Sequence, residues 1–244
     1  MSSLFESTQR ESAVDIVVNS IKQLLIEGKL KPGDRMPNEQ EIADGLKVSR
    51  GSVREAMKIL SAFGLIDIKV GNGTYICEKP GNKMMDSLLF SYFAANPDLN
   101  DLYEFRNMFE CGLVELIVRH YDENAEERSA LKKNVAQLEN LIKSRSSAEE
   151  RYQNDMEFHK LLGAASLNPL VTQTYNAILE FMDLSIRATH KAQDGSEAYR
   201  VHKDILDLIE RRDYANINKV VGNSVELWYN LENTAVNEAE MKSL

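Results

Sequence analysis

Glycine and proline divide the chain into two unlike parts. Eight of the twelve glycines and three of the five prolines lie within the first 81 of the 244 residues. Because these residues end helices and form tight turns, we expect short elements there. From about residue 84 onward the chain consists of long amphipathic runs that predict helices, with breaks such as Asn168-Pro169 and Asp194-Gly195. The predicted fold class is mainly α, ending in an antiparallel bundle of six or seven helices.

The polar segment around Pro80 and Gly81 is typical of a linker. We therefore predict a first domain at residues 1–79, a linker at 80–83, a second domain at 84–235 and a tail at 236–244. Apolar residues make up 43% and charged residues 27%, which is ordinary for a globular protein. No segment approaches the roughly 18 apolar residues of a membrane span, so we expect a cytoplasmic protein with no membrane partner.

Charge is distributed unevenly between the two predicted domains. The net charge of −9 argues, taken alone, against a nucleic-acid partner. Residues 1–80 contain 11 basic and 11 acidic side chains, however, so the whole deficit belongs to residues 81–244. The first domain is therefore not excluded from binding DNA. The two cysteines, Cys77 and Cys111, cannot form a disulfide framework, and we expect reduced thiols.

The first domain shows the pattern of a winged helix-turn-helix. One amphipathic helix is expected from Ser12 to Glu27, and a second begins after Asn38, with Glu41 placed for a capping box. A third helix follows Ser49 after a tight turn. Two apolar runs then flank Gly71-Asn-Gly73, which predicts a β-hairpin, the wing.

The third predicted helix carries Arg50 and Arg54 on one face at its N-terminal end. This is where a recognition helix contacts base edges in the major groove, and arginine binds guanine through two hydrogen bonds. Two short helices with one or two arginines also occur in many enzymes. The consecutive order of helix, turn, capped helix, arginine-bearing helix and glycine-tipped hairpin favours DNA binding.

Three stretches carry a family resemblance: residues 28–39 (GKLKPGDRMPNE), residues 48–60 (VSRGSVREAMKIL) and the wing with Gly-Asn-Gly-Thr. Residues 12–79 resemble the DNA-binding domain of the GntR family of bacterial transcription regulators. The resemblance implies that DNA is contacted by Arg35, Gln40, Ser49, Arg50, Ser52, Arg54 and Gly71. Gln40 and Val70 stand where the fatty-acid regulator of that family has arginine and histidine, so we expect a different operator sequence.

In the second domain, Asp155 and His159 are spaced i, i+4 and so share one helix face. His202 lies on a separate predicted helix. One carboxylate and two imidazoles are suitable ligands for a divalent metal such as zinc, manganese or nickel. Taken alone, the pattern favours capping or hydrogen-bonded surface histidines over metal ligands. His120 and His190 are interpreted as structural.

The order of Glu104 to Glu110, Asp155-x-x-Phe-His159, Ala165 to Pro169 and His202 is similar to the FCD effector domain of the FadR subfamily. The resemblance covers residues 84–235. It implies that an Asp and three His hold a metal and that a small carboxylate effector completes the coordination of this metal. Asp155, His159 and His202 match three ligands. At the position of the fourth ligand, where the family has a histidine, this chain reads Gly222-Asn-Ser. Either three protein ligands hold the metal, with a weak contribution from Asn223 or Ser224, or the metal has been lost.

Four residues are candidates for binding the effector. Arg106 fits a carboxylate through two hydrogen bonds, although Glu110 at i, i+4 allows an exposed ion pair instead. The other three candidates are Asn168, Arg187 and Asn223.

These observations predict a homodimeric regulator, acting as a repressor, that binds a pseudo-palindromic operator in double-stranded DNA. A sugar acid or hydroxy acid would control its operator affinity. Two alternatives remain: a metal-free regulator that senses a larger ligand such as an acyl-coenzyme A, and, more remotely, a metal-dependent enzyme. No placed nucleophile or cofactor loop supports the enzyme.

Overall fold

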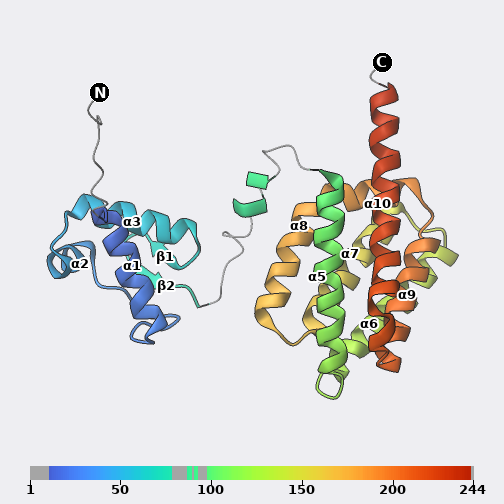
Figure 1. Cartoon of the computed structure of the whole chain (residues 1–244), viewed down its shortest axis with the longest axis horizontal. Coiled ribbons are helices and arrows are strands. Elements are labelled where there is room, and N and C mark those ends of the chain that lie inside the picture. Colours follow the sequence, from blue (N-terminus) through green and yellow to red (C-terminus); the bar gives the residue numbers. More distant parts are fainter. Residues whose placement is uncertain (1–10, 79–86, 90, 93–97, 243–244) are drawn as a thin grey trace, which may run out of the picture. The chain divides into compact units, whose positions relative to one another are not determined.

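The computed structural model describes residues 11–78, 87–89, 91–92 and 98–242 (Figure 1). The chain forms two compact units, Met1–Ser87 and Leu88–Leu244. The predicted linker at 80–83 lies outside the described residues. Each unit has its own hydrophobic core, and each is described separately below.

Residues 11–78, the described part of the first unit up to the linker, form three helices and one hairpin in the predicted order. These elements are α1 (Ala13–Ile26), α2 (Glu39–Leu46), α3 (Arg50–Ala62), β1 (Ile66–Lys69) and β2 (Gly73–Ile76). The predicted capping box is present, because the Asn38 side chain accepts from the backbone of Glu41 and the Glu41 side chain accepts from that of Asn38. Lys47 then ends α2 in the left-handed conformation, which turns the chain sharply toward α3. The winged helix-turn-helix is confirmed.

The hairpin pairs Ile66 with Ile76 and Lys69 with Gly73 in antiparallel register. Gly71, in the connecting turn, has φ of +77°, a conformation that favours glycine. Ile66 and Ile76 are buried with Val53 and Leu60 of α3, so the wing is fixed to the core of this unit.

The second unit is a helical bundle. From residue 98 onward it consists of α5 (Leu99–Arg119), α6 (Ala125–Lys143), α7 (Ala148–Ala165), α8 (Pro169–Ala192), α9 (Ser196–Arg211), the short 3-10 helix η1 (Tyr214–Asn216) and α10 (Ile217–Lys242). Short loops make α6, α7 and α8 antiparallel neighbours (Figure 1). The mainly α fold class is confirmed. Residues 236–242, assigned above to a tail, continue α10.

Helix α7 supplies the centre of this bundle. A capping box of Ser147 and Glu150 starts it, and α6 and α8 pack on either side. Phe158 and Leu162 are fully buried in the hydrophobic core, yet Asp155 and His159 on the same helix are buried as well. Buried ionisable groups are rare unless they are paired, so Asp155 and His159 must have polar partners inside the bundle.

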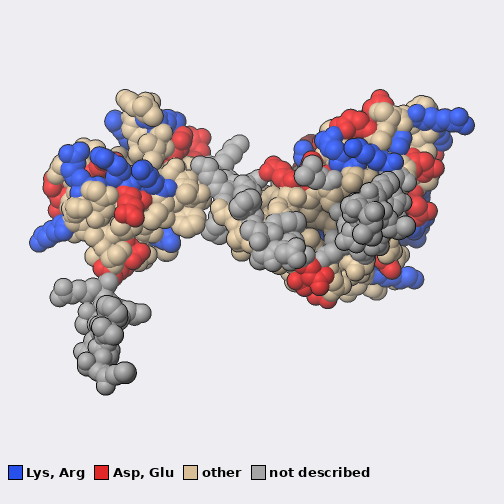
Figure 2. All heavy atoms as spheres, turned by 90° about the horizontal axis from the view of Figure 1, so that it is seen from above, with Lys and Arg blue, Asp and Glu red and all other residues tan. Residues whose placement is uncertain are grey.

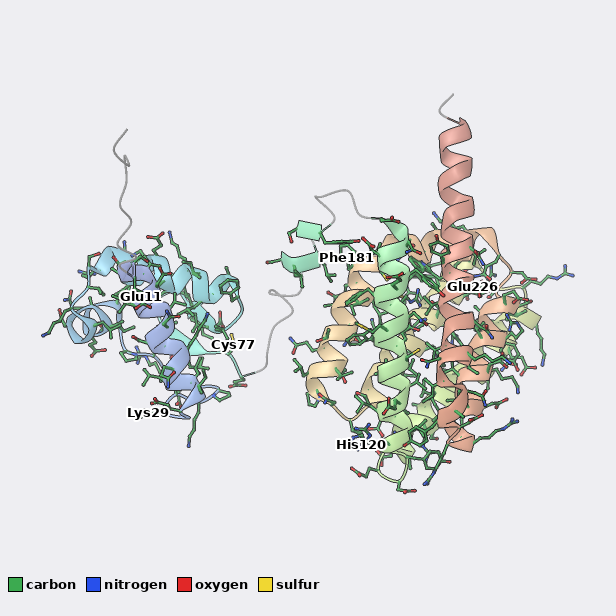
Figure 3. The ribbon with its side chains drawn as sticks, viewed as in Figure 1. Glu11, Lys29, Cys77, His120, Phe181 and Glu226 are labelled. Carbon is green, nitrogen blue, oxygen red and sulfur yellow. The ribbon has the colours of Figure 1, made fainter. Side chains whose placement is uncertain are left out.

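Charged side chains of both signs cover the visible faces of both units (Figure 2). No helix among the described residues is both long and apolar enough to cross a membrane. His120, the C-cap of α5, lies 3.6 Å from Glu123 and at the opposite end of the bundle from Phe181 (Figure 3).

Candidate metal centre and candidate DNA interface

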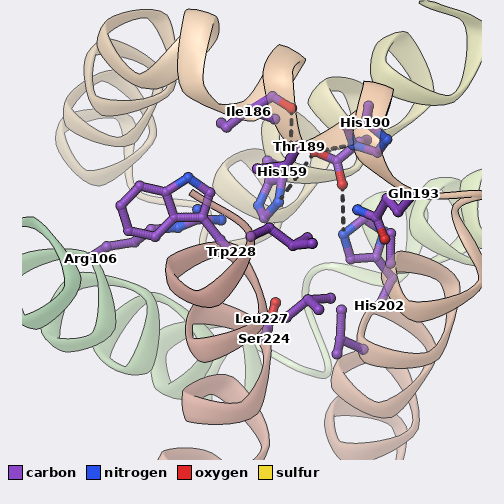
Figure 4. A pocket seen from close by; sticks show the side chains of 14 residues that line it. Arg106, His159, Ile186, Thr189, His190, Gln193, His202, Ser224, Leu227 and Trp228 are labelled. Carbon is purple, nitrogen blue, oxygen red and sulfur yellow. Dashed lines mark hydrogen bonds and ion pairs between the residues drawn. The ribbon is translucent and has the colours of Figure 1, made fainter. Parts of the chain in front are cut away.

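A cavity of about 40 Å³ lies among five helices of the second unit (Figure 4). Room of this size holds roughly three water-sized groups. Each of α5, α7, α8, α9 and α10 contributes to the lining, which consists of Arg106, Asp155, His159, Ile186, Thr189, His190, Gln193, Ala198, Val201, His202, Ser224, Leu227, Trp228 and Leu231.

The Asp155 carboxylate lies among three imidazoles. These belong to His159, His190 and His202, which are labelled in Figure 4. Asp155 Oδ1 is 3.2 Å from His202 Nε2, and its Oδ2 is 3.4 Å from His190 Nε2 and 3.9 Å from His159 Nε2. The potential ligand atoms of Asp155, His159 and His202 all lie within 4.8 Å of one another. The structure therefore brings together the three residues for which the sequence predicts metal ligation.

The protonation states of this cluster suit a metal ion. Burial alone would raise the pKa of Asp155, but hydrogen bonds from His190 and His202 hold it well below its usual range. Burial lowers the pKa of His159 from 6.5 to about 4. At neutral pH the site thus offers an ionised carboxylate and a neutral imidazole, which are the forms that bind metal. One oxygen and two nitrogen donors fit a borderline divalent ion such as zinc.

His190 is a member of the cluster that sequence reasoning missed, because it was interpreted as structural. It is 2% exposed, lines the cavity and contacts Asp155. The spacing of His190 and Asp155 along the chain does not predict their contact, since the two residues lie on different helices. Only the packing of α8 against α7 brings them together.

Arg106 is buried at 4% exposure, with its Nε 2.7 Å from Glu110 Oε1. The predicted ion pair therefore exists, but inside the bundle instead of on its surface. Arg106 also lines the cavity, and its guanidinium lies 5.3 Å from the centre of the Trp228 ring. Its Nη1 has no hydrogen-bond partner among the described residues. Glu110 thus neutralises this arginine without using all of its donors.

The other three effector candidates lie outside the cavity lining. Asn168 caps α8, accepting from the backbone nitrogens of Leu170 and Val171. Arg187 pairs with Glu149 at 2.5 Å. Asn223 is exposed, and the adjacent Ser224 lines the cavity in its place. The one-residue difference follows from the rotation of α10, which turns each successive side chain by about 100°.

In the first unit, the predicted DNA-binding residues cluster at the start of α3. Ser49 is the N-cap of α3, and its Oγ accepts from the Ser52 nitrogen at 3.0 Å and lies 2.8 Å from Ser52 Oγ. Arg50 begins the helix and is exposed. Arg54 is also exposed, with its Nη2 3.0 Å from Glu39 Oε2 at the start of α2.

The remaining predicted contacts flank this helix. Arg35 lies against the wing, because a Cβ built on Gly73 would come within 3.0 Å of its Nε. At the wing, Val70 is fully exposed beside Gly71. Gln40 instead donates to Asp44 at 2.8 Å on its own helix. Two arginines, two hydroxyls and a glycine-tipped wing on one small domain form an arrangement that can bind a duplex.

A winged helix-turn-helix joined to a helical domain with a buried polar cavity defines the class of DNA-binding transcription regulators that contain a separate sensing domain. The chain belongs to the GntR family and carries an FCD domain. Residues 14–76 match the family described as "Bacterial regulatory proteins, gntR family", and residues 101–226 match the FCD domain. Members of these families regulate transcription and are not enzymes.

Relatives agree with this assignment, and a solved structure shares the fold. The chain is 31% identical over 216 residues to the "Uncharacterized HTH-type transcriptional regulator YcbG" of Bacillus subtilis, covering 85% of this chain and 84% of that protein. It is 27% identical to the "Uxu operon transcriptional regulator" of Escherichia coli, covering 87% and 81%. The structure titled "Streptococcus agalactiae GntR" shares the fold, with a TM-score of 0.63 at 22% identity, covering 89% of this chain and 99% of that chain.

Proposed function

We propose that this protein is a homodimeric, cytoplasmic repressor of the FadR subfamily whose operator affinity is controlled by a small carboxylate bound beside a metal ion. The observation that carries the proposal is the buried cluster of Asp155, His159 and His202 in the same cavity as Arg106. A buried cavity that offers metal ligands and a cationic donor together suits a metal-chelating acid.

Asp155, His159 and His202 would hold the metal, and zinc is the preferred ion because structural and sensory sites with such donors commonly select it. Three protein ligands leave positions open for oxygen atoms of an effector. The metal supplies positive charge there, and Ser224 lies where the resemblance places a fourth ligand. A hydroxy acid or a sugar acid offers a carboxylate and an adjacent hydroxyl that can bind through both oxygens.

The size of the cavity favours a small effector over an acyl-coenzyme A. Room for roughly three water-sized groups accepts the chelating end of a small acid, whereas a pantetheine chain requires a long channel. The names of relatives include both an "HTH-type transcriptional repressor NanR" and a "Glc operon transcriptional activator". The repressor assignment therefore rests on the general resemblance to the family.

On DNA, two copies of the first unit would read the two halves of a pseudo-palindromic operator, since the symmetry of a dimer is mirrored in its binding site. Effector binding would shift the population between arrangements of different operator affinity. Couplings of this kind are typically worth about 1–3 kcal/mol.

Metal content and thermal stability test the sensing half of the proposal. We expect purified wild type to contain about one zinc per chain by elemental analysis, and His159→Ala to contain almost none. Hydroxy acids, sugar acids and short dicarboxylates should raise the melting temperature only without chelator. Absence of metal from both proteins would contradict the metal site, and stabilisation that survives chelator would favour the metal-free alternative.

A further inference from the structure

His159 is connected to Arg106 by a continuous chain of buried hydrogen bonds. His159 Nδ1 lies 2.7 Å from the Tyr175 hydroxyl, and that hydroxyl lies 2.9 Å from Glu110 Oε1. Arg106 Nε donates to the same Glu110 oxygen at 2.7 Å. All four residues are at most 4% exposed, so bulk solvent has little access to these bonds. We call Arg106, Glu110, Tyr175 and His159 the relay.

The protons of the relay can be assigned from its geometry. Glu110 pairs with Arg106 and is ionised, so its carboxylate can only accept. The Tyr175 hydroxyl has one proton and donates it to Glu110. Its oxygen must therefore accept from His159, which places the imidazole proton on Nδ1. The Nε2 atom of His159 is left with a free lone pair.

The distances around Asp155 agree with this assignment. His190 Nε2 and His202 Nε2 lie 3.4 and 3.2 Å from the carboxylate, within reach of a hydrogen bond that an Nε2 proton would make. His159 Nε2 lies 3.9 Å away, which is too far for such a bond. Two imidazoles thus donate to Asp155, while the third faces the carboxylate with a lone pair.

We propose that Tyr175, held by Glu110 and Arg106, is a positioning residue that fixes His159 in the tautomer able to bind a metal through Nε2. Metal-binding histidines commonly donate their other nitrogen to a carboxylate, which fixes the ring and raises its basicity. Here a tyrosine stands between the histidine and the carboxylate. His202 has no such support, because its Nδ1 has no partner among the described residues. His159 is therefore the ligand whose tautomer is already correct before a metal binds. The metal half of this inference rests on the proposed metal site, but the tautomer does not.

The tautomer can be measured directly, because the chain contains only four histidines. The metal-free protein, labelled with 15N in histidine, is examined by long-range proton–nitrogen correlation, and the signals are assigned by replacing each histidine in turn. We expect His159 to be protonated on Nδ1, and Tyr175→Phe to abolish this preference. The matched control is Tyr121→Phe, which removes the part-buried tyrosine hydroxyl that links the turn after α5 to α9, 3.3 Å from Glu210 and outside the cavity lining. An Nε2 proton on His159 in wild type, or an unchanged spectrum in Tyr175→Phe, would overturn the proposal.

Metal affinity provides the second measurement. In competition with a chelator, we expect Tyr175→Phe to bind Zn²⁺ or Co²⁺ about 10–100-fold more weakly than wild type. The Co²⁺ absorption should keep the same band pattern, since no ligand is lost, and Tyr121→Phe should match wild type in affinity. Equal affinity of Tyr175→Phe and wild type would also overturn the inference. If wild type binds no metal, the proposed metal site is wrong. The 15N measurement of the His159 tautomer then decides by itself whether Tyr175 positions His159.

Discussion

At the scale of single residues, the partners of Asp155 explain how an acidic side chain can be retained inside the bundle. Asp155 is 6% exposed, and two imidazoles at hydrogen-bond distance of its carboxylate replace the water that it has lost. A buried charge is tolerated when such partners are present and is costly when they are removed.

The metal-free protein should lose stability in acid through His159. Because its pKa falls from 6.5 to about 4 on burial, the unfolded chain takes up a proton in this pH range and the folded protein does not. This contribution to stability is therefore complete above pH 6.5 and is lost progressively as the pH falls to 4. The total is about 3 kcal/mol.

Urea denaturation in the presence of chelator, from pH 7 to pH 4, measures this loss. His159→Gln, which carries no titrating group, is the control and should show a smaller decrease in the free energy of unfolding. Parallel decreases in the two proteins would contradict the assigned role of His159.

Two ion pairs on α5 have the same spacing but different surroundings. Arg106 and Glu110 are buried, whereas Arg119 and Glu115 are exposed, and both pairs are i, i+4 at 2.7 Å. Glu110→Ala leaves a buried cation unpaired and should reduce the free energy of unfolding by about 3–5 kcal/mol. Glu115→Ala should cost less than about 1 kcal/mol. Denaturation of the two variants in one buffer tests the difference, and similar losses would show that burial does not determine the effect.

This pair also shows what a sequence can predict at the residue scale. The i, i+4 spacing of Arg106 and Glu110 in the sequence predicts their contact. The sequence does not predict their burial, because burial depends on α8 and α10 covering that face of α5. Likewise, the spacing of Asp155 and His159 predicts a shared face, whereas the contribution of His190 depends on tertiary packing alone.

At the scale of elements, local chemistry determined what could be predicted. The first helix was expected from Ser12 to Glu27 and runs from Ala13 to Ile26, because capping is decided by neighbouring residues. The same holds for the capping box of Asn38 and for the glycine-tipped hairpin. Which face of α8 or α10 lines a cavity depends instead on helix rotation within the bundle. Arg187 and Asn223 were expected in the cavity and lie elsewhere for this reason, whereas Asn168 lies outside it because it caps the N-terminal end of α8.

The start of α3 carries a prediction about DNA. Arg50→Ala and Arg54→Ala should each weaken operator binding by about 1–3 kcal/mol, if these arginines read bases. Lys29→Ala is the control, because Lys29 pairs with Glu27 beyond the end of α1 and should not affect binding. Binding to DNA upstream of the gene is measured by gel shift at fixed salt. Wild-type affinity in both folded arginine variants would contradict the recognition-helix assignment.

Glu39 links α2 to this recognition helix. Its carboxylate holds Arg54 at 3.0 Å, so DNA that bound Arg54 as predicted would have to compete with an existing ion pair for that guanidinium. Glu39→Gln should therefore strengthen binding to random duplex DNA, while the loss of Arg54 positioning should reduce the preference for the operator over random DNA. The two affinities are compared in the same gel-shift assay. An unchanged ratio would mean that Glu39 does not position Arg54.

At the scale of the whole molecule, the acidity of the chain does not conflict with DNA binding. The net charge of −9 arises entirely from residues 81–244, and the first 80 residues are neutral overall. Affinity for DNA must then come from a few well-placed cations instead of a general positive field. The sequence predicted this division, since charge and glycine content both change near the same place in the chain.

Arg106 has a consequence for how the molecule would combine signals. The same guanidinium holds Glu110 in the relay and lines the cavity where an acid would bind. Any anion that draws Arg106 toward itself changes the support of His159, and any metal on His159 changes the charge that the anion meets. Thermodynamic reciprocity then requires each to alter the affinity of the other by the same factor. If the proposed metal and the proposed acid both bind in this cavity, operator binding would depend on their two concentrations together, because neither affinity is independent of the other ligand.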